Sequence, residues 1–173
     1  TPVDARVLEA MRPFLEGAFG NPSSLHAWGR EAKKALDNAR ATIARCLSAQ
    51  PEELFFPSGA TEADNLVILG VAQAQAAKGR HLVTTCIEHA ALVSAFVQLQ
   101  TQGWEVTQLP VDADGFVSLQ AVEAALRPDT ALVSVIHGNN EIGVLQPVEA
   151  IGELLRERAV PFHIDAVQTV GKL

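Results

Sequence analysis

Short apolar segments alternate along most of this chain with amphipathic segments long enough to form helices. The candidate strands are Leu54–Phe56, His81–Thr85, Glu105–Leu109, Ala131–Ile136 and Val160–Ile164. The helical patterns between them cover about Thr61–Lys78, Ala90–Gln102, Leu119–Leu126 and Pro147–Arg158. This alternation is typical of repeated βαβ units, so we predict an α/β fold with one mostly parallel sheet and helices on both faces.

Two further helical patterns precede these units. Residues 3–16 and Trp28–Leu47 carry apolar stripes, and a turn-rich segment at residues 19–26 separates them. We expect two regions, an amino-terminal helical region of residues 1–16 and the front part of an α/β domain of residues 17–173. The chain lacks an initiator Met and stops soon after its last strand, so we expect it to be a piece of a longer polypeptide.

Composition narrows the choice of partners. Apolar residues make up 48% of the 173 residues and charged residues 19%, the balance of a folded soluble protein. A net charge of −7 argues against nucleic-acid and acidic membrane surfaces as partners. Cys46 and Cys86 lack CxxC spacing and fit a reducing cytoplasm, where we expect both to be small buried structural thiols. The five histidines lack metal-ligand spacing, so we assign no metal.

Polar residues follow several of the predicted strands. In open parallel sheets the ligand lies beyond the carboxyl ends of the strands, so the loops there are the candidate site. Four such loops carry polar groups: Ser58–Glu62, Glu88–His89, Asn139–Glu141 and Asp165–Gln168. Together they form a constellation that a purely structural role does not require.

The segment PSGATEADN, residues 57–65, opens a predicted helix with small residues. The free N–H groups of such a helix start attract anions, and a phosphate would fit there with the Thr61 hydroxyl as an added donor. The simpler interpretation is that Ser58 or Thr61 caps the helix while Glu62 favours its positive end.

His89 and Asp165 each come directly after a predicted strand. The His89 ring could stack on a planar ligand or transfer a proton, or it could be a half-buried histidine with a structural hydrogen bond. The Asp165 carboxylate would emerge among apolar neighbours, where it is costly unless paired with a cation or a protonated ring nitrogen. Its alternative role is to cap the next helix or to bind a backbone amide.

Four segments in this order resemble the cysteine desulfurases of the aminotransferase class V group: PSGATEADN, IEHAAL, NNEIGVLQP and FHIDAVQTVGKL. FGNPSSLHAWG and LPVDADGFVSL fit the same family, so the resemblance covers essentially the whole chain. It implies that residues 17–173 are the front part of the large cofactor domain of a fold-type I pyridoxal-phosphate enzyme, and that residues 1–16 pack near its small domain.

The resemblance also implies a role for each candidate site residue. Ala60 and Thr61 would hold the cofactor phosphate, and Asn140 would lie near the substrate carboxylate. His89 would stack on the pyridine ring, Asp165 would pair with the ring nitrogen, and Gln168 would bind the phenolic oxygen. His89 and Asp165 are thus the candidate catalytic residues.

The reaction implied is the conversion of L-cysteine into L-alanine, with the sulfur leaving as an enzyme persulfide for a sulfur-acceptor or iron–sulfur scaffold protein. The resemblance further implies a cytoplasmic homodimer. The lysine that bonds the cofactor aldehyde, the loop cysteine, an arginine for the substrate carboxylate and the small domain are expected beyond Leu173, and a complementary carboxyl-terminal fragment is a further expected partner. The lysines present, Lys33, Lys34, Lys78 and Lys172, are not placed to reach the aldehyde.

Other functions stay open at this point. Selenocysteine lyase or kynureninase would share the same fold, although the NNEIG segment favours a desulfurase. A cofactor-free scaffold that kept the α/β layers is the alternative of another class.

Overall fold

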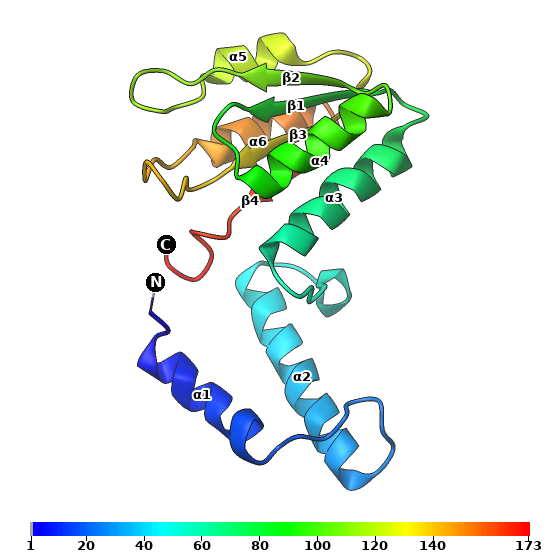
Figure 1. The fold of residues 1–173 in the computed structure, drawn as a ribbon, viewed down its shortest axis with the longest axis vertical. Helices are drawn as coiled ribbons and strands as arrows, with labels where there is room; N and C mark the ends of the chain where they lie inside the picture. The colour runs from blue at the N-terminus through cyan, green and yellow to red at the C-terminus, as the bar shows by residue number, and fades with distance from the viewer. Residues whose placement is uncertain (1) are drawn as a thin grey trace. The chain divides into compact units, whose positions relative to one another are not determined.

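The computed structural model describes residues 2–173 as two compact units, one ending at Phe56 and the other comprising Pro57–Leu173 (Figure 1). The first unit contains helix α1 (Ala5–Glu16), helix α2 (Ala27–Cys46) and the short 3₁₀ helix η1 (Pro51–Glu53). Asp4 begins α1 by accepting a hydrogen bond from the Arg6 N–H at 2.8 Å, as an N-cap residue does. The boundary that we predicted between an amino-terminal region, residues 1–16, and the rest of the chain stays a prediction.

The second unit is a four-stranded parallel sheet with strand order β2-β1-β3-β4. Its elements in chain order are α3 (Ala60–Gln75), β1 (His81–Thr85), α4 (Ala90–Thr101), β2 (Glu105–Leu109), α5 (Leu119–Ala125), β3 (Thr130–Ile136), α6 (Val148–Glu157) and β4 (Phe162–Asp165). The predicted parallel α/β sheet is confirmed.

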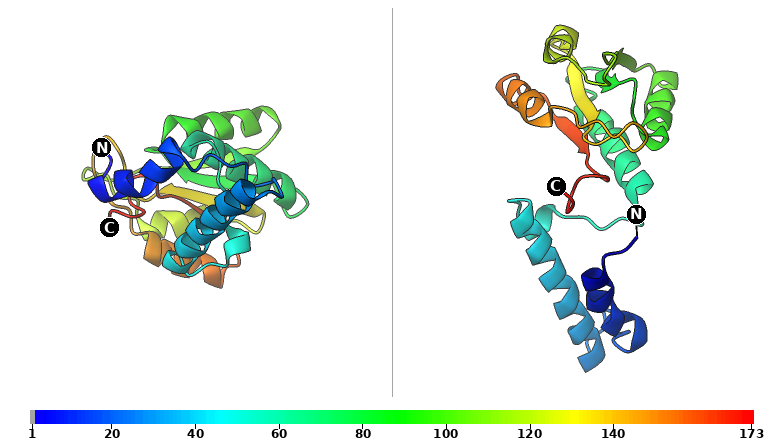
Figure 2. Two further views of the ribbon diagram at one scale, coloured as in Figure 1. Left: turned by 90° about the horizontal axis from the view of Figure 1, so that it is seen from below. Right: turned by 90° about the vertical axis from the view of Figure 1, so that its left-hand side faces the viewer.

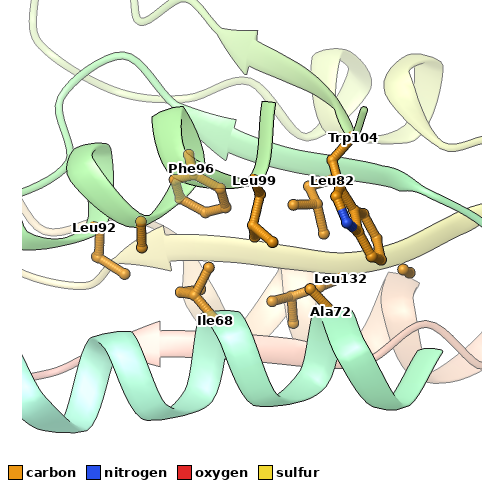
Figure 3. Packing of buried hydrophobic residues seen from close by; sticks show 10 residues of the cluster. Ile68, Ala72, Leu82, Leu92, Phe96, Leu99, Trp104 and Leu132 are labelled. Atoms are coloured by element: carbon orange, nitrogen blue, oxygen red, sulfur yellow. The ribbon is translucent and has the colours of Figure 1, made fainter. Parts of the chain in front are cut away.

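Helices cover both faces of this sheet, because successive strand residues point to opposite sides. Leu82 and Leu132 pack in one cluster with side chains of α3 and α4, whereas Val83 and Val133 pack in a second cluster with α5 and α6. The right-hand view of Figure 2 shows the two helix pairs on opposite sides of the strands. Figure 3 shows Ile68 of α3 and the α4 side chains meeting those of β1 and β3.

The strand predicted at Leu54–Phe56 is wrong. This segment follows η1 as extended chain and pairs with no strand in the described part of the chain. The Leu54 carbonyl accepts a hydrogen bond from the Arg40 guanidinium, which also lies 4.7 Å from the centre of the Phe56 ring. Pro57 comes next and has no N–H to offer a neighbouring strand. An apolar run therefore does not form a strand when a side chain already binds its carbonyl and the following residue has no N–H to donate.

The carboxyl ends of the strands lie at one edge of the sheet, with Ile136 of β3 in register with Asp165 of β4. The predicted loops after β1, β3 and β4 therefore gather there, whereas the fourth predicted loop, Ser58–Glu62, does not follow a strand. Within residues 2–173, none of the helices combines the length and apolar character needed to cross a lipid bilayer.

Candidate active site

A cavity of about 120 Å³ lies at this carboxyl edge of the sheet. It is lined by Ala60, Asp64, His89, Ile136, Asn140, Asp165, Val167 and Gln168. Its lining is buried at Asp64, Ile136 and Asp165 and exposed at His89, Asn140 and Gln168. We call the buried group the floor and the exposed group the rim. Five of the six predicted site residues thus line one cavity, and the sixth, Thr61, is next to Ala60 in the chain.

The start of α3 is free of side-chain caps. Its N-cap residue is Gly59, and neither Ser58 nor Thr61 caps the helix. Instead the Glu62 carboxylate accepts hydrogen bonds from the Ser58 N–H at 2.8 Å and from the Ser58 hydroxyl at 2.6 Å, which lowers the Glu62 pKa. Within residues 2–173, no acceptor binds the first N–H groups of α3. The prediction that Ser58 or Thr61 caps the helix is therefore wrong, although Glu62 does lie in its first turn, and these amides are available to an anion.

His89 is the N-cap residue of α4. Its Nδ1 atom accepts a hydrogen bond from the Ala91 N–H at 3.2 Å. This contact fixes the orientation of the ring at the cavity rim and leaves the proton of the neutral ring on Nε2. His89 therefore combines a helix cap with a ring presented to the cavity.

Asp165 ends β4 and is 6% exposed. Its Oδ1 atom accepts a hydrogen bond from the Val167 N–H at 3.0 Å, so the predicted alternative contact with a backbone amide does exist. Its Oδ2 atom has no hydrogen-bond partner within residues 2–173. Asp165 Oδ1 thus stabilises the turn after β4, while Oδ2 is available to a donor in the cavity.

The two adjacent asparagines have different surroundings. Asn139 donates to the Ile87 carbonyl at 2.8 Å and accepts from the Glu141 and Ile142 N–H groups at 2.8 and 2.9 Å. Asn140 is exposed and lines the cavity. Asn139 therefore shapes the loop, and Asn140 is free to contact a ligand.

Gln168 lies at the rim, where its Oε1 atom accepts a hydrogen bond from Lys172 Nζ at 3.4 Å. Lys172 thus contacts a rim residue without lining the cavity itself. Lys78, by contrast, donates to the Ala159 carbonyl.

The sequence analysis missed Asp64, which lines the floor and is 4% exposed. A signal was present, because Asp64, Ile68 and Ala72 follow one another at four-residue spacing and all three are buried on one face of α3. Burial, together with the charge of Asp165, raises the pKa of Asp64 to about 6.

Glu88 was noted only as the neighbour of His89, but it connects two strands. Its Oε1 atom accepts hydrogen bonds from the Thr85 hydroxyl at 2.6 Å and from the Ile136 N–H at 3.0 Å. Burial raises the Glu88 pKa to about 7 despite these bonds. Glu88 therefore ties the end of β1 to Ile136 at the end of β3, a residue that lines the cavity.

The prediction that both cysteines are buried is wrong. Cys46 and Cys86 are exposed free thiols. Cys46 is the last residue of α2 and Cys86 the first residue after β1, where the chain leaves the packed elements.

The chain is similar in sequence and in structure to proteins described as cysteine desulfurases or NifS-like proteins. The cysteine desulfurase IscS of Serratia proteamaculans (strain 568) is 52% identical over 176 residues, which cover 100% of this chain and 44% of that protein. A solved NifS-like protein is 40% identical with a TM-score of 0.92, over 98% of this chain and 47% of that one. A solved structure described as SspA in complex with cysteine is 42% identical with a TM-score of 0.90, over 98% of this chain and 49% of that one.

The chain spans less than half the length of these proteins. The similarity to cysteine desulfurases that the sequence motifs predicted is confirmed. The sequence pattern of the family described as Aminotransferase class-V matches residues 1–173. The chain therefore belongs to the aminotransferase class V family.

Proposed function

We propose that this chain supplies the cofactor-binding part of a pyridoxal-phosphate-dependent cysteine desulfurase, which converts L-cysteine into L-alanine and passes the sulfur onward. One observation carries the proposal: Asp165 is buried at the floor of the cavity with one carboxylate oxygen free. The names of the similar proteins support it, since one is a cysteine desulfurase and another is described in complex with cysteine.

The residues around the cavity fit pyridoxal phosphate, which supplies an electron sink when it is bound. A phosphate needs donors and positive potential, and the uncapped amides at Ala60 and Thr61 supply both. A protonated ring nitrogen needs a buried anionic acceptor, and the free oxygen of Asp165 supplies one. We expect Asp165 to keep that nitrogen protonated.

The exposed rim provides the remaining contacts. His89 is held by the Ala91 N–H, so its ring is oriented before a ligand arrives and can stack on a flat one. Its Nε2 atom is the ring nitrogen free to exchange a proton with a bound substrate. We expect Gln168 to donate to the phenolic oxygen of the cofactor and Asn140 to bind the substrate carboxylate near it.

Further parts of the enzyme are expected outside residues 1–173. These are the lysine that bonds the cofactor aldehyde, the mobile-loop cysteine that takes the sulfur, the arginine that binds the substrate carboxylate, and the small domain. We also propose a cytoplasmic homodimer that delivers sulfur to an acceptor or iron–sulfur scaffold protein. If the polypeptide were cleaved after this segment, the complementary carboxyl-terminal fragment would be its partner.

A substrate comparison tests the proposal. The full-length protein is incubated with pyridoxal phosphate, a thiol reductant and either L-cysteine, L-selenocysteine or L-kynurenine. We expect alanine and sulfide from L-cysteine at the highest kcat/KM. Faster release of selenide or anthranilate would instead assign a selenocysteine lyase or a kynureninase. Failure to bind the cofactor or release alanine from any of the three would indicate the scaffold function.

A further inference from the structure

The cavity floor holds a second carboxylate beside Asp165. Asp64 projects from the first turns of α3, is 4% exposed and lines the same cavity. A carboxylate this deeply buried requires an explanation, because burial disfavours its charge. The explanation lies in the groups that surround it.

His163 of β4 is one of these groups. Its Nε2 atom lies 3.9 Å from Asp64 Oδ1, and its Nδ1 atom lies 2.9 Å from the Ser134 hydroxyl. The short distance to Asp64 suggests an ion pair, but burial lowers the pKa of His163 more than the charge of Asp165 raises it. At neutral pH the His163 ring is therefore uncharged, and it does not cancel the charge of Asp64.

The elements packed against α3 add few other charges. Strand β3 and the body of α4 contain no titratable residue. The groups that remain are His89 at the N-cap of α4, Asp165 on β4, and Glu88, whose own pKa is raised mainly by burial and to a smaller extent by Asp165. Asp64 and Asp165 are therefore the two carboxylates that line the floor itself.

The charge of Asp64 depends on pH. Burial and Asp165 raise its pKa to about 6, and His89 acts in the opposite direction. Asp64 is therefore mostly ionised at pH 8 and mostly neutral at pH 5. Asp64 therefore adds a negative charge to the floor at the higher pH that it does not add at the lower.

We propose, on the basis of the function proposed above, that Asp64 is a positioning residue that acts through Asp165. Its carboxylate adds negative potential at the cavity floor and so strengthens the hold of Asp165 on a protonated pyridine nitrogen. The His163 ring, 3.9 Å from Asp64 Oδ1, is uncharged at neutral pH and so does not neutralise this carboxylate.

A binding experiment on the full-length protein, freed of cofactor, tests this role. The probe is 4′-deoxypyridoxine 5′-phosphate, which keeps the ring nitrogen and phosphate but lacks the aldehyde, so its affinity is measured without turnover. We expect Asp64→Asn to weaken calorimetric binding roughly tenfold at pH 8, the effect of one nearby charge, and to leave it unchanged at pH 5. Asp64→Ser, which also removes the charge, serves if the asparagine variant does not fold.

Glu157→Gln is the matched control, because it removes an exposed negative charge at the end of α6, and it should bind the probe like the unaltered protein. Equal weakening by Asp64→Asn at both pH values would indicate a structural role and overturn the proposal, as would no weakening at all. A probe that does not bind the unaltered protein, or binds Asp165→Asn equally well, would overturn the proposed function and this proposal with it.

Discussion

The polar groups at the two edges of the parallel sheet differ in how completely they are hydrogen-bonded within the chain. At the amino edge, His81 is fully buried, and its Nδ1 and Nε2 atoms lie 2.9 Å from the hydroxyls of Thr130 and Thr107. Beside them, the Arg127 guanidinium donates to Asp129 and Glu105 at 2.5–2.8 Å. Every charge and ring nitrogen of this group has a partner within the chain.

At the carboxyl edge the groups are only partly paired. Glu88 Oε2 is buried without a hydrogen-bond partner within residues 2–173, and so is the Thr84 hydroxyl near the end of β1. The buried carboxylates Asp64 and Asp165 share the cavity floor. A buried polar group left unpaired costs about 1–3 kcal/mol, and folds accept such costs mainly at functional sites. The amino edge thus serves stability, and the carboxyl edge is arranged for a ligand.

The largest expected effect is a loss of kcat on replacing the aspartate Asp165 at the carboxyl edge, compared with replacing Asp129 at the amino edge. In the full-length protein with cofactor, Asp165→Asn should lower kcat for L-cysteine by about 100-fold or more, because it removes the charge opposite the ring nitrogen. Asn retains an acceptor for the Val167 N–H, and cofactor binding should suffer less because the start of α3 is unchanged. Asp129→Asn at the amino edge is the control and should leave kcat unchanged. Equal activities of the two variants would remove the functional distinction between the edges.

Much of the fold and of the carboxyl edge can be predicted from sequence, because the alternation of apolar and amphipathic segments depends on local spacing. It predicted four of the strands, the shared edge and the residues of the rim. Asp64 was missed because a charged residue in the first turns of a helix usually faces water, and its burial depends on β4, about 100 residues further along the chain. The exposed cysteines and the missing strand at Leu54–Phe56 likewise depend on how surrounding segments pack.

A smaller effect is expected at the amino edge from His81→Ala. The substitution removes a packed ring and leaves the hydroxyls of Thr107 and Thr130 without their partner, so the free energy of unfolding should fall by about 2–3 kcal/mol. Urea unfolding of the full-length protein at pH 7.5 measures it. The kcat of the folded variant should be unchanged, and a selective loss of kcat would contradict the stabilising role of this edge.

The same variant should alter the response to acid. Burial is the main cause that lowers the His81 pKa below 6.5, so the folded state resists a proton that the unfolded state accepts. The stability due to neutral His81 is therefore present above pH 6.5 and is lost as the pH falls below it. His81→Ala should show a weaker loss of stability in this range than the unaltered protein.

The smallest effect is expected from Glu88→Gln, and its pH dependence has the opposite sign. Burial raises the Glu88 pKa from 4.5 to about 7, so the contribution of Glu88 to folding stability is present below pH 4.5 and is lost as the pH rises through 7.

Glutamine cannot ionise, yet it keeps an acceptor for the Thr85 hydroxyl and the Ile136 N–H. We expect the variant to gain about 2 kcal/mol of stability relative to the parent between pH 5 and pH 8. Glu105→Gln, at the amino edge, should bring no gain at pH 8, because it breaks an exposed contact with Arg127. Urea unfolding at both pH values measures the difference, and a Glu88→Gln effect that is the same at pH 5 and pH 8 would show that ionisation of Glu88 carries no cost.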